Sequence, residues 1–372
     1  MSVPPIVFRA DASRVMGTGH VMRCLTLADV LADRGWRCGF VCRDHEGHLA
    51  KWVKARGHDL WLLPAEGCQA KSVDTEDLPA HANWLGVSWQ QDAHDTASVL
   101  DMGVVQWLVV DHYGIDARWE KALAPKAVKL MVIDDLADRA HRCDLLLDQN
   151  PGRTQADYMS RVPGDCTFLT GTRYALLRKE FGQWRERRPV ANRTGGVDRI
   201  LVTLGGADPD NITGLVLAAL SRSGLSPDTS LDIVMGPSSP WLEAVREQAR
   251  QLRFRSTVTA GATDMAERMT QADLAIGAAG ATTWERCCLG LPSLVVAIAE
   301  NQRAFLDIVA SQGLAAVADL ADLEGAVRTF IDTMQAQPER YFDMVKQASQ
   351  AVDGLGAARV ADAMTGMLEV TV

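Results

Sequence analysis

The sequence predicts an α/β protein made of two Rossmann-like, doubly wound domains, and three observations lead to this prediction. Short apolar runs alternate with amphipathic stretches, which is typical of β-α-β units and parallel sheets. The 372 residues are 47% hydrophobic, which is enough for two filled cores. The alternation stops once, at residues 181–198, where charge, Gly and Pro indicate a linker. We therefore expect one domain over residues 1–180 and another over residues 199–345.

Each expected domain has its own series of buried strands. The first series is, in chain order, IVFRAD, CGFVCR, DLWLLP, VQWLVVDHY, KLMVIDD and DLLLDQ. A helix from about residue 19 to residue 34, ended by Gly35, is predicted after the first of these strands. The second series is RILVTLGG, LDIVMG, STVTAG, DLAIGAAG and SLVVAIA.

Composition excludes several classes of protein. The 47 acidic residues against 38 basic ones leave a net charge of -9, which argues against binding to nucleic acid or to an anionic membrane. The apolar runs are far shorter than the roughly 18 residues of a membrane-spanning helix. The N-terminus lacks the apolar core of a signal peptide, and the eight cysteines include no C-x-x-C. We therefore expect a cytoplasmic protein with reduced thiols and without a metal ion.

The expected first domain contains all eight histidines, so any imidazole chemistry must come from it. In SRVMGTGHVMRC, Gly17 and Gly19 do not make a dinucleotide fingerprint, because Met22 stands where its third glycine should be. His20 would lie in the first turn of the predicted helix, at the carboxyl end of a strand, where open α/β sheets bind ligands. The alternative is that His20 simply caps the helix. The two glycines favour a site, because they let a substrate approach the backbone closely.

Further polar residues follow two other strands of this domain. In VVDHYG, Asp111 could orient a base and Tyr113 could bind or protonate a substrate oxygen. An equally open alternative is that these residues merely end a buried strand. In VIDDLADR, Asp134 and Asp135 are adjacent and would point in opposite directions on a strand, so we expect no magnesium site there.

The second domain carries polar strand ends of another kind. Gly205 and Gly206 precede a helix start in VTLGGADPDN, where free backbone N–H groups could hold a diphosphate. In IGAAGATTWE, Gly280 clears space at the next helix start, and Glu285 could grip the two hydroxyls of a ribose. AENQRAF then offers further groups for sugar hydroxyls or amides. Three such ends on one sheet favour a nucleotide-sugar site over purely structural turns.

Several of these motifs together carry a family resemblance. They are RADASRVMGTGHVMRCLTLADVL, VVDHYGID, RYALLRKEF, TLGGADPDN, GAAGATTWERCCLGLP and ENQ, in this order. The chain resembles the nucleotide-sugar hydrolases of pseudaminic acid biosynthesis, which cleave UDP-2,4-diacetamido-2,4,6-trideoxy-β-L-altropyranose to free sugar and UDP. That family is similar in fold to the GT-B glycosyltransferases. The resemblance implies two domains facing a cleft, with the nucleotide on the C-terminal domain. It also implies that the C-terminal helical segment, residues 346–372, crosses back to the N-terminal domain.

The resemblance also implies roles for individual residues. His20 would be the general base for water attack with inversion, with Asp111 and Tyr113 beside it. The implied substrate-binding residues are Gly17, Gly19, Arg23, Arg173, Gly205, Gly206, Asn211, Gly280, Ala281, Thr282, Glu285, Asn301 and Gln302. No cofactor or metal is implied, and we expect a monomer whose partner is a UDP-sugar.

Two alternatives stay open, namely a GT-B glycosyltransferase with a UDP-sugar donor and a non-catalytic nucleotide-sugar-binding protein. The segment around residues 64–95 has the character of an insertion, and the sequence assigns it no purpose.

Overall fold

The computed structural model describes residues 5–65, 78–101, 103–206, 208–298 and 302–369. The chain divides into two compact units. The first comprises Met1–Leu176 together with Gly356–Val372, and the second comprises Leu177–Leu355. Both units are layered α/β structures built on an all-parallel sheet, as the sequence predicts.

The sheet of the first unit has the strand order β3-β2-β1-β4-β5-β6-β7. Its strands are β1 (Ile6–Ala10), β2 (Cys38–Arg43), β3 (Asp59–Leu63), β4 (Val105–Asp111), β5 (Ala127–Ile133), β6 (Leu145–Asp148) and β7 (Thr167–Thr170). The order runs outward in both directions from β1 and β4, which is the doubly wound arrangement. The order reverses between β1 and β4, which is where doubly wound sheets bind their ligands.

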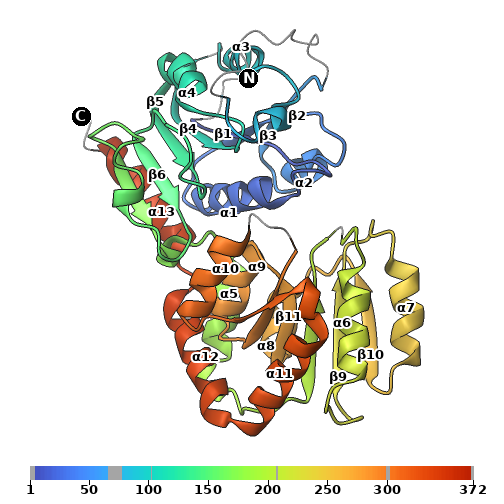
Figure 1. Cartoon of the computed structure of the whole chain (residues 1–372). Helices are drawn as coiled ribbons and strands as arrows, with labels where there is room; N and C mark the ends of the chain where they lie inside the picture. The colour runs from blue at the N-terminus through green and yellow to red at the C-terminus, as the bar shows by residue number, and fades with distance from the viewer. Residues whose placement is uncertain (1–4, 66–77, 102, 207, 299–301, 370–372) are drawn as a thin grey trace. The chain divides into compact units, whose positions relative to one another are not determined.

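Helices cover both faces of this sheet (Figure 1). They are α1 (Gly19–Asp33), α2 (Ala50–Ala55), α3 (Trp89–Leu100), α4 (Ala117–Leu123) and α13 (Gly356–Glu369). Along β1 the side chains alternate between two cores: Phe8 packs in one core with residues of α1 and α13, and Val7 packs in the other with residues of α3 and α4. The predicted return of the C-terminal segment to the first domain is thus made by α13, and Trp107 Nε1 donates to the Met364 carbonyl at 3.2 Å.

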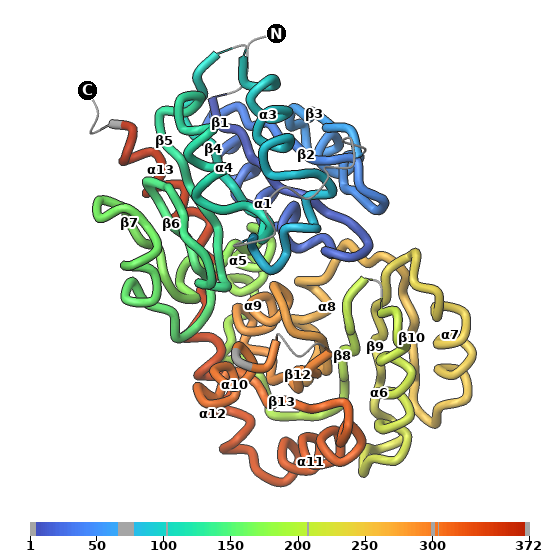
Figure 2. The backbone as a smooth tube through the Cα atoms, turned by 45° about the horizontal axis from the view of Figure 1, so that its top comes forward, coloured from blue at the N-terminus to red at the C-terminus, as the bar shows by residue number. Residues whose placement is uncertain are grey.

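The sheet of the second unit has the order β10-β9-β8-β11-β12-β13, with the corresponding reversal of strand order between β8 and β11. Figure 2 shows α6 and α7 beside strands β9 and β10. The strands are β8 (Arg199–Thr203), β9 (Ser230–Met235), β10 (Arg255–Ala260), β11 (Leu274–Ala278), β12 (Ser293–Ala297) and β13 (Ala316–Asp319). The helices are α5 (Lys179–Arg187), α6 (Ile212–Ser221), α7 (Leu242–Gln251), α8 (Met265–Gln271), α9 (Ala281–Cys288), α10 (Arg303–Ser311), α11 (Leu323–Ala336) and α12 (Pro338–Ala351).

The structure differs from the expected domain limits at the linker and at the C-terminal segment. The expected linker begins inside α5, and its arginines are tied to the second unit. Arg185 donates to the carbonyls of Cys288 and Val352, and Arg193 donates to that of Leu289. Arg185 and Arg193, part of the charge that indicated a linker, therefore donate to backbone carbonyls of the second unit. Residue 346 falls inside α12, which packs with α9 and α11 of the second unit, so the return to the first unit starts only at Gly356.

The structure also bears on the cysteines and on membrane-spanning helices. The described cysteines are all buried and free, and Cys68 lies outside the described residues. Within the described part of the chain, no helix is both long enough and apolar enough to traverse a bilayer.

Candidate active site

The site in the first unit lies where β1 and β4 run side by side. Ala10 at the end of β1 pairs with Asp111 at the end of β4, so the loops after both strands start at the same edge of the sheet. The loop after β1 leads through Gly17 into α1, which begins at Gly19, as predicted. His20 is therefore in the first turn of α1 and next to the end of β4.

Three side chains of this site form a buried hydrogen-bonded group. His20 Nδ1 lies 2.6 Å from Asp111 Oδ1. Arg23, one turn further along α1, donates to both oxygens of Asp111, from Nε at 2.6 Å and from Nη2 at 2.7 Å. Asp111 is fully buried and His20 is 6% exposed. The arrangement fixes the orientation of the imidazole ring, because its Nδ1 is engaged by a carboxylate that is itself held by two hydrogen bonds.

The charge of Asp111 follows from its neighbours. Burial alone would raise the pKa of this carboxyl, but the Arg23 guanidinium and the His20 ring hold that pKa well below its usual range. Asp111 is thus ionised at neutral pH and accepts a hydrogen bond from Nδ1–H of His20. In that tautomer Nε2 of His20 carries the lone pair and can accept a proton.

Tyr113 completes the group with its ring and with its hydroxyl. The ring meets that of His20 edge-on, with 4.5 Å between centroids. The hydroxyl donates to Asp135 Oδ1 at 2.5 Å, and the other oxygen of Asp135 accepts from Arg23 at 2.8 Å. Burial and the Asp135 carboxylate raise the pKa of Tyr113 well above its usual range. The geometry therefore favours Tyr113 as a packing surface over Tyr113 as a proton donor.

The glycine loop is open to a ligand. Gly17 has φ 81°, in the left-handed region that favours glycine, and a Cβ on Gly17 or Gly19 would meet no atom of the described residues within 4 Å. The N-cap residue, Thr18, makes no side-chain capping hydrogen bond. The His20 side chain points to Asp111 instead of capping the helix, which disfavours the purely structural alternative for this histidine.

Arg9 and Asp11, close to His20 in the sequence, belong to a different group. Arg9 bridges Asp11 at 2.6 Å and Asp92 at 2.7 Å, all three side chains being fully buried. His112, adjacent to Asp111 in the sequence, has its Nε2 3.4 Å from Asp11. Because successive residues of a strand point to opposite faces, Asp111 joins the His20 group while His112 joins the Arg9 group.

Sequence reasoning missed two aromatic residues of this site. Trp84 lies in the 3-10 turn η1 (Ala82–Leu85), and His81 directly precedes this turn. Both belong to the segment around residues 64–95, and both rings contact that of Tyr113. Their spacing of three residues was the available signal, since side chains at i and i+3 of a 3-10 turn lie one above the other.

In the second unit, the two predicted helix starts differ in their capping. At α6, the Asp208 carboxylate accepts from the backbone N–H of Ile212 and Thr213, at 2.8 and 2.9 Å, and Asn211 Oδ1 accepts from that of Gly214 at 3.2 Å. These side chains occupy the N–H groups that an anion would need. Substrate binding by Asn211, Gly205 and Gly206 stays a prediction.

The start of α9 is open by comparison. Ala281 is exposed and Gly280 has φ 119°; among the described residues, no atom lies within 4 Å of a Cβ placed on Gly280, and no side chain caps the helix. The fully buried Arg286 donates to Thr283 Oγ1 at 3.2 Å and approaches Thr282 Oγ1 at 3.4 Å, which places a positive charge behind the first turn. Burial lowers the pKa of Arg286 to about 10. Within the part of the chain that the structure describes, the start of α9 is therefore positive and carries no capping side chain.

Glu285 lies on the same helix and is ion-paired. Its Oε1 accepts from Arg178 Nη2 at 3.2 Å. Burial raises the pKa of Glu285 although the Arg178 guanidinium opposes that rise. A ligand hydroxyl at Glu285 would therefore compete with, or add to, the Arg178 contact.

The remaining predicted substrate-binding residues are Arg173, Gln302 and Asn301. Arg173 is exposed on the turn η4 (Thr172–Tyr174), with its guanidinium 5.1 Å from the ring of Tyr174. Gln302 Oε1 accepts from the Ile298 backbone N–H at 3.2 Å. Asn301 lies outside the described residues.

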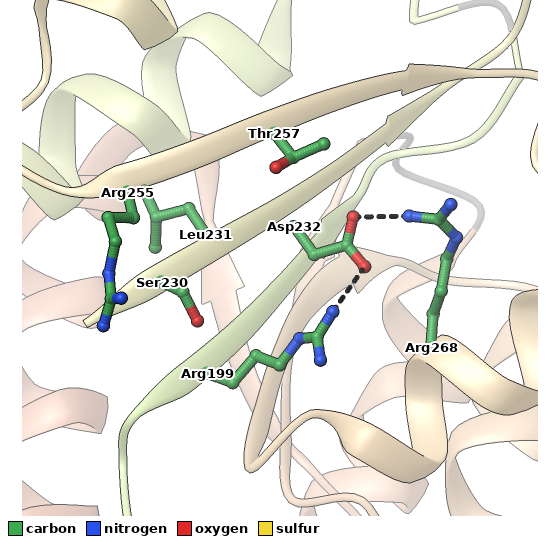
Figure 3. Close-up of a pocket in the computed structure, with 7 residues that line it drawn as sticks. All are labelled: Arg199, Ser230, Leu231, Asp232, Arg255, Thr257 and Arg268. Atoms are coloured by element: carbon green, nitrogen blue, oxygen red, sulfur yellow. Dashed lines mark hydrogen bonds and ion pairs between the residues drawn. The ribbon is translucent and has the colours of Figure 1, made fainter. Parts of the chain in front are cut away.

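A pocket of about 350 Å³ in the second unit is separate from these groups. It lies at the amino ends of β8, β9 and β10, where Asp232 stands between Arg199 and Arg268 (Figure 3). Asp232 Oδ1 accepts from Arg268 at 2.7 Å. Gly205 and Gly280 follow the carboxyl ends of their strands, so this pocket is at the opposite edge of the sheet. Parallel sheets bind ligands at the carboxyl ends of their strands, so we do not assign the substrate to this pocket.

Comparisons with known proteins agree with this architecture. Residues 199–361 match the family model of the glycosyltransferase family 28 C-terminal domain. The spore coat polysaccharide biosynthesis protein SpsG of Bacillus subtilis is 33% identical over 218 residues, which are 57% of this chain and 63% of SpsG. The match thus spans less than two thirds of that relative. The UDP-2,4-diacetamido-2,4,6-trideoxy-beta-L-altropyranose hydrolase of Campylobacter jejuni is 26% identical over 246 residues, 66% of this chain and 74% of that protein.

Among solved structures, that of MurG from Acinetobacter baumannii resembles this one with a TM-score of 0.66. The likeness covers 97% of this chain and 99% of MurG at 16% identity, so it establishes the fold alone. The two parallel-sheet α/β units thus have the GT-B fold, and the second unit contains most of the segment that matches the family 28 C-terminal domain.

Proposed function

We propose that this protein hydrolyses a UDP-linked 2,4-diacetamido-2,4,6-trideoxy sugar of the altrose type to free sugar and UDP, as in pseudaminic acid biosynthesis. The observation that carries the proposal is the hydrogen bond of 2.6 Å between His20 Nδ1 and the buried Asp111 carboxylate. A histidine so oriented can serve as a general base, and a hydrolase needs such a base to activate water. The resemblance to the Campylobacter jejuni hydrolase supports the choice of substrate.

In the proposed reaction, Nε2 of His20 takes a proton from water as the oxygen attacks the anomeric carbon from the face opposite UDP. The bond to the UDP oxygen breaks in the same step, so the configuration inverts. His20 becomes an imidazolium, which the Asp111 carboxylate at Nδ1 stabilises. A positioned base of this kind contributes on the order of 10²–10⁴ in rate.

The leaving group is assigned to the second unit. The diphosphate gains negative charge as the bond breaks, and the uncapped start of α9 with Arg286 behind it would stabilise that charge. Glu285, one turn further, would accept hydrogen bonds from the ribose hydroxyls. Neither role requires a metal ion, so we expect activity to survive EDTA. A magnesium requirement restored by titration would contradict this part of the proposal.

A second candidate function is glycosyl transfer from a UDP-sugar, which the matched glycosyltransferase family 28 domain favours. The two candidates separate when the protein is incubated with the UDP-sugar and no acceptor. Release of UDP and free sugar at an enzymatic rate, with inverted configuration by NMR, supports hydrolysis. UDP release only after an acceptor is added would overturn hydrolysis in favour of transfer. Binding without turnover under either condition would leave a nucleotide-sugar-binding protein.

A further inference from the structure

Three aromatic side chains form a continuous surface next to His20. Trp84 stacks on Tyr113 with 5.8 Å between ring centroids and 30° between planes. His81 contacts both, at 4.4 Å from Trp84 and 5.6 Å from Tyr113. The Tyr113 ring in turn meets the His20 ring. We call His81, Trp84 and Tyr113 the aromatic wall.

The aromatic wall is held firmly in the first unit. Leu85, next to Trp84, is 1% exposed and belongs to the core that includes residues of α3 and α4. The Trp84 backbone N–H donates to the His81 carbonyl at 3.0 Å, which closes the turn. A Cβ on Gly114 would lie 2.8 Å from that carbonyl, so only glycine lets the loop after β4 pack this closely against the turn. The rings are therefore fixed by main-chain contacts on both sides.

The wall offers mainly apolar ring faces, beside the polar ring nitrogens of His81 and Trp84. All three side chains are half-buried, so parts of their rings stay accessible. The Tyr113 hydroxyl is engaged by Asp135, and it is the ring that remains for contacts with a ligand. Aromatic faces carry partial negative charge and attract C–H and methyl groups. A hydroxyl placed against them would lose a hydrogen bond to water without gaining one.

We propose that the aromatic wall is the subsite for the sugar ring, and that His81 and Trp84 make the site select deoxy, acetamido-bearing sugars over fully hydroxylated ones. This inference rests on the proposed function and gives His81 and Trp84, within the segment around residues 64–95, a purpose. A 6-methyl group and acetamido methyl groups would pack on the wall, which would place the anomeric carbon beside His20.

The test measures binding without turnover. Calorimetric titration of the His20→Ala variant with the UDP-linked diacetamido-trideoxy sugar gives the reference Kd. Adding Trp84→Ala should raise that Kd about tenfold while the Kd for UDP alone stays the same. Trp84→Phe should recover most of the loss, because it keeps a ring. The matched control is Trp52→Ala, since Trp52 is 49% exposed on α2 and should leave both Kd values unchanged.

The outcomes separate this inference from the function on which it rests. If the His20→Ala variant does not bind the UDP-sugar at all, the proposed function fails. If it binds, and folded Trp84→Ala binds equally well, the aromatic wall is not the sugar subsite. In the active enzyme, Trp84→Ala should also move the kcat/KM ratio between 6-methyl and 6-hydroxymethyl UDP-sugars toward one. An unchanged ratio would overturn the selectivity. If Trp84→Ala does not fold, His81→Leu takes its place: it should raise the Kd for the UDP-sugar and leave that for UDP unchanged, and an unchanged Kd for the UDP-sugar would overturn the inference.

Discussion

Asp111 and His20 are separated by 91 positions in the sequence, and the structure places Oδ1 of the first 2.6 Å from Nδ1 of the second. The carboxylate reaches the histidine because β4 lies next to β1 in the sheet. Arg23 holds the same carboxylate from the other side and keeps it ionised. This relationship turns a histidine at a helix start into a candidate base, and it leads to the first two predictions.

Replacement of His20 by Ala or Asn should lower kcat by about 10²–10⁴-fold and leave UDP affinity nearly intact. The reason is that the base belongs to the first unit, while the nucleotide is assigned to the second. Steady-state rates of UDP release and calorimetric titration with UDP measure the two effects. A comparable loss of UDP affinity would contradict the division of roles, and near-normal turnover would remove His20 from the mechanism.

Replacement of Asp111 by Asn should also lower kcat by about 10²-fold or more, because an amide no longer fixes the tautomer of His20. The variant should be less stable by about 3–5 kcal/mol, since Arg23 loses a buried charged partner. Asp135→Asn is the matched control, because Asp135 contacts Arg23 and Tyr113 without a hydrogen bond to His20. Rates and denaturation curves of both variants test the idea, which fails if Asp135→Asn costs as much in kcat as Asp111→Asn.

Replacement of Glu285 by Gln should raise KM for the UDP-sugar and Ki for UDP together, by about tenfold or more, with a much smaller change in kcat. The amide keeps the shape of the side chain but weakens its charge-assisted hydrogen bonds. Arg178→Met serves as control, because it removes the ion pair at 3.2 Å and leaves the carboxylate in place. A collapse of kcat with normal UDP binding would show that Glu285 takes part in the chemistry.

Replacement of Asp148 by Asn should stabilise the protein above neutral pH. Burial raises the pKa of Asp148 to about 7, against about 3.9 in an unfolded chain. At a pH between these two pKa values, Asp148 is protonated in the folded protein and ionised in the unfolded chain. The free energy of unfolding therefore falls as pH rises from the lower pKa to the higher one. Asn cannot ionise, and it retains groups to pair with the Tyr158 hydroxyl, which lies 2.7 Å from Asp148 Oδ2.

At pH 8 the free energy of unfolding of Asp148→Asn should exceed that of the wild type by about 1–4 kcal/mol, and this difference should shrink toward pH 4. Urea denaturation at both pH values measures it, with the exposed Asp165→Asn as control. Equal pH dependence of wild type and Asp148→Asn would show that Asp148 is ionised in the folded protein throughout this range.

The sequence by itself determined the two parallel-sheet units and the position of the main candidate groups at strand ends. Apolar periodicity and helix-start signals are local, so the helix that begins at Gly19 and the open turn at Gly280 could be located without the structure. The same local patterns placed Asp111 at the end of a strand. They left open whether it served a base or merely ended that strand.

Only the tertiary structure decided which of these groups meet. Strand order brings Asp111 to His20, and the alternation of side chains sends its neighbour His112 to another buried group. The turn that carries Trp84 reaches Tyr113 through packing between segments distant in the sequence. Such contacts form because surfaces from distant parts of the chain are buried against each other, which lowers the free energy of the folded state. Local sequence patterns show which face of an element is apolar, but they do not show which distant segment packs on it.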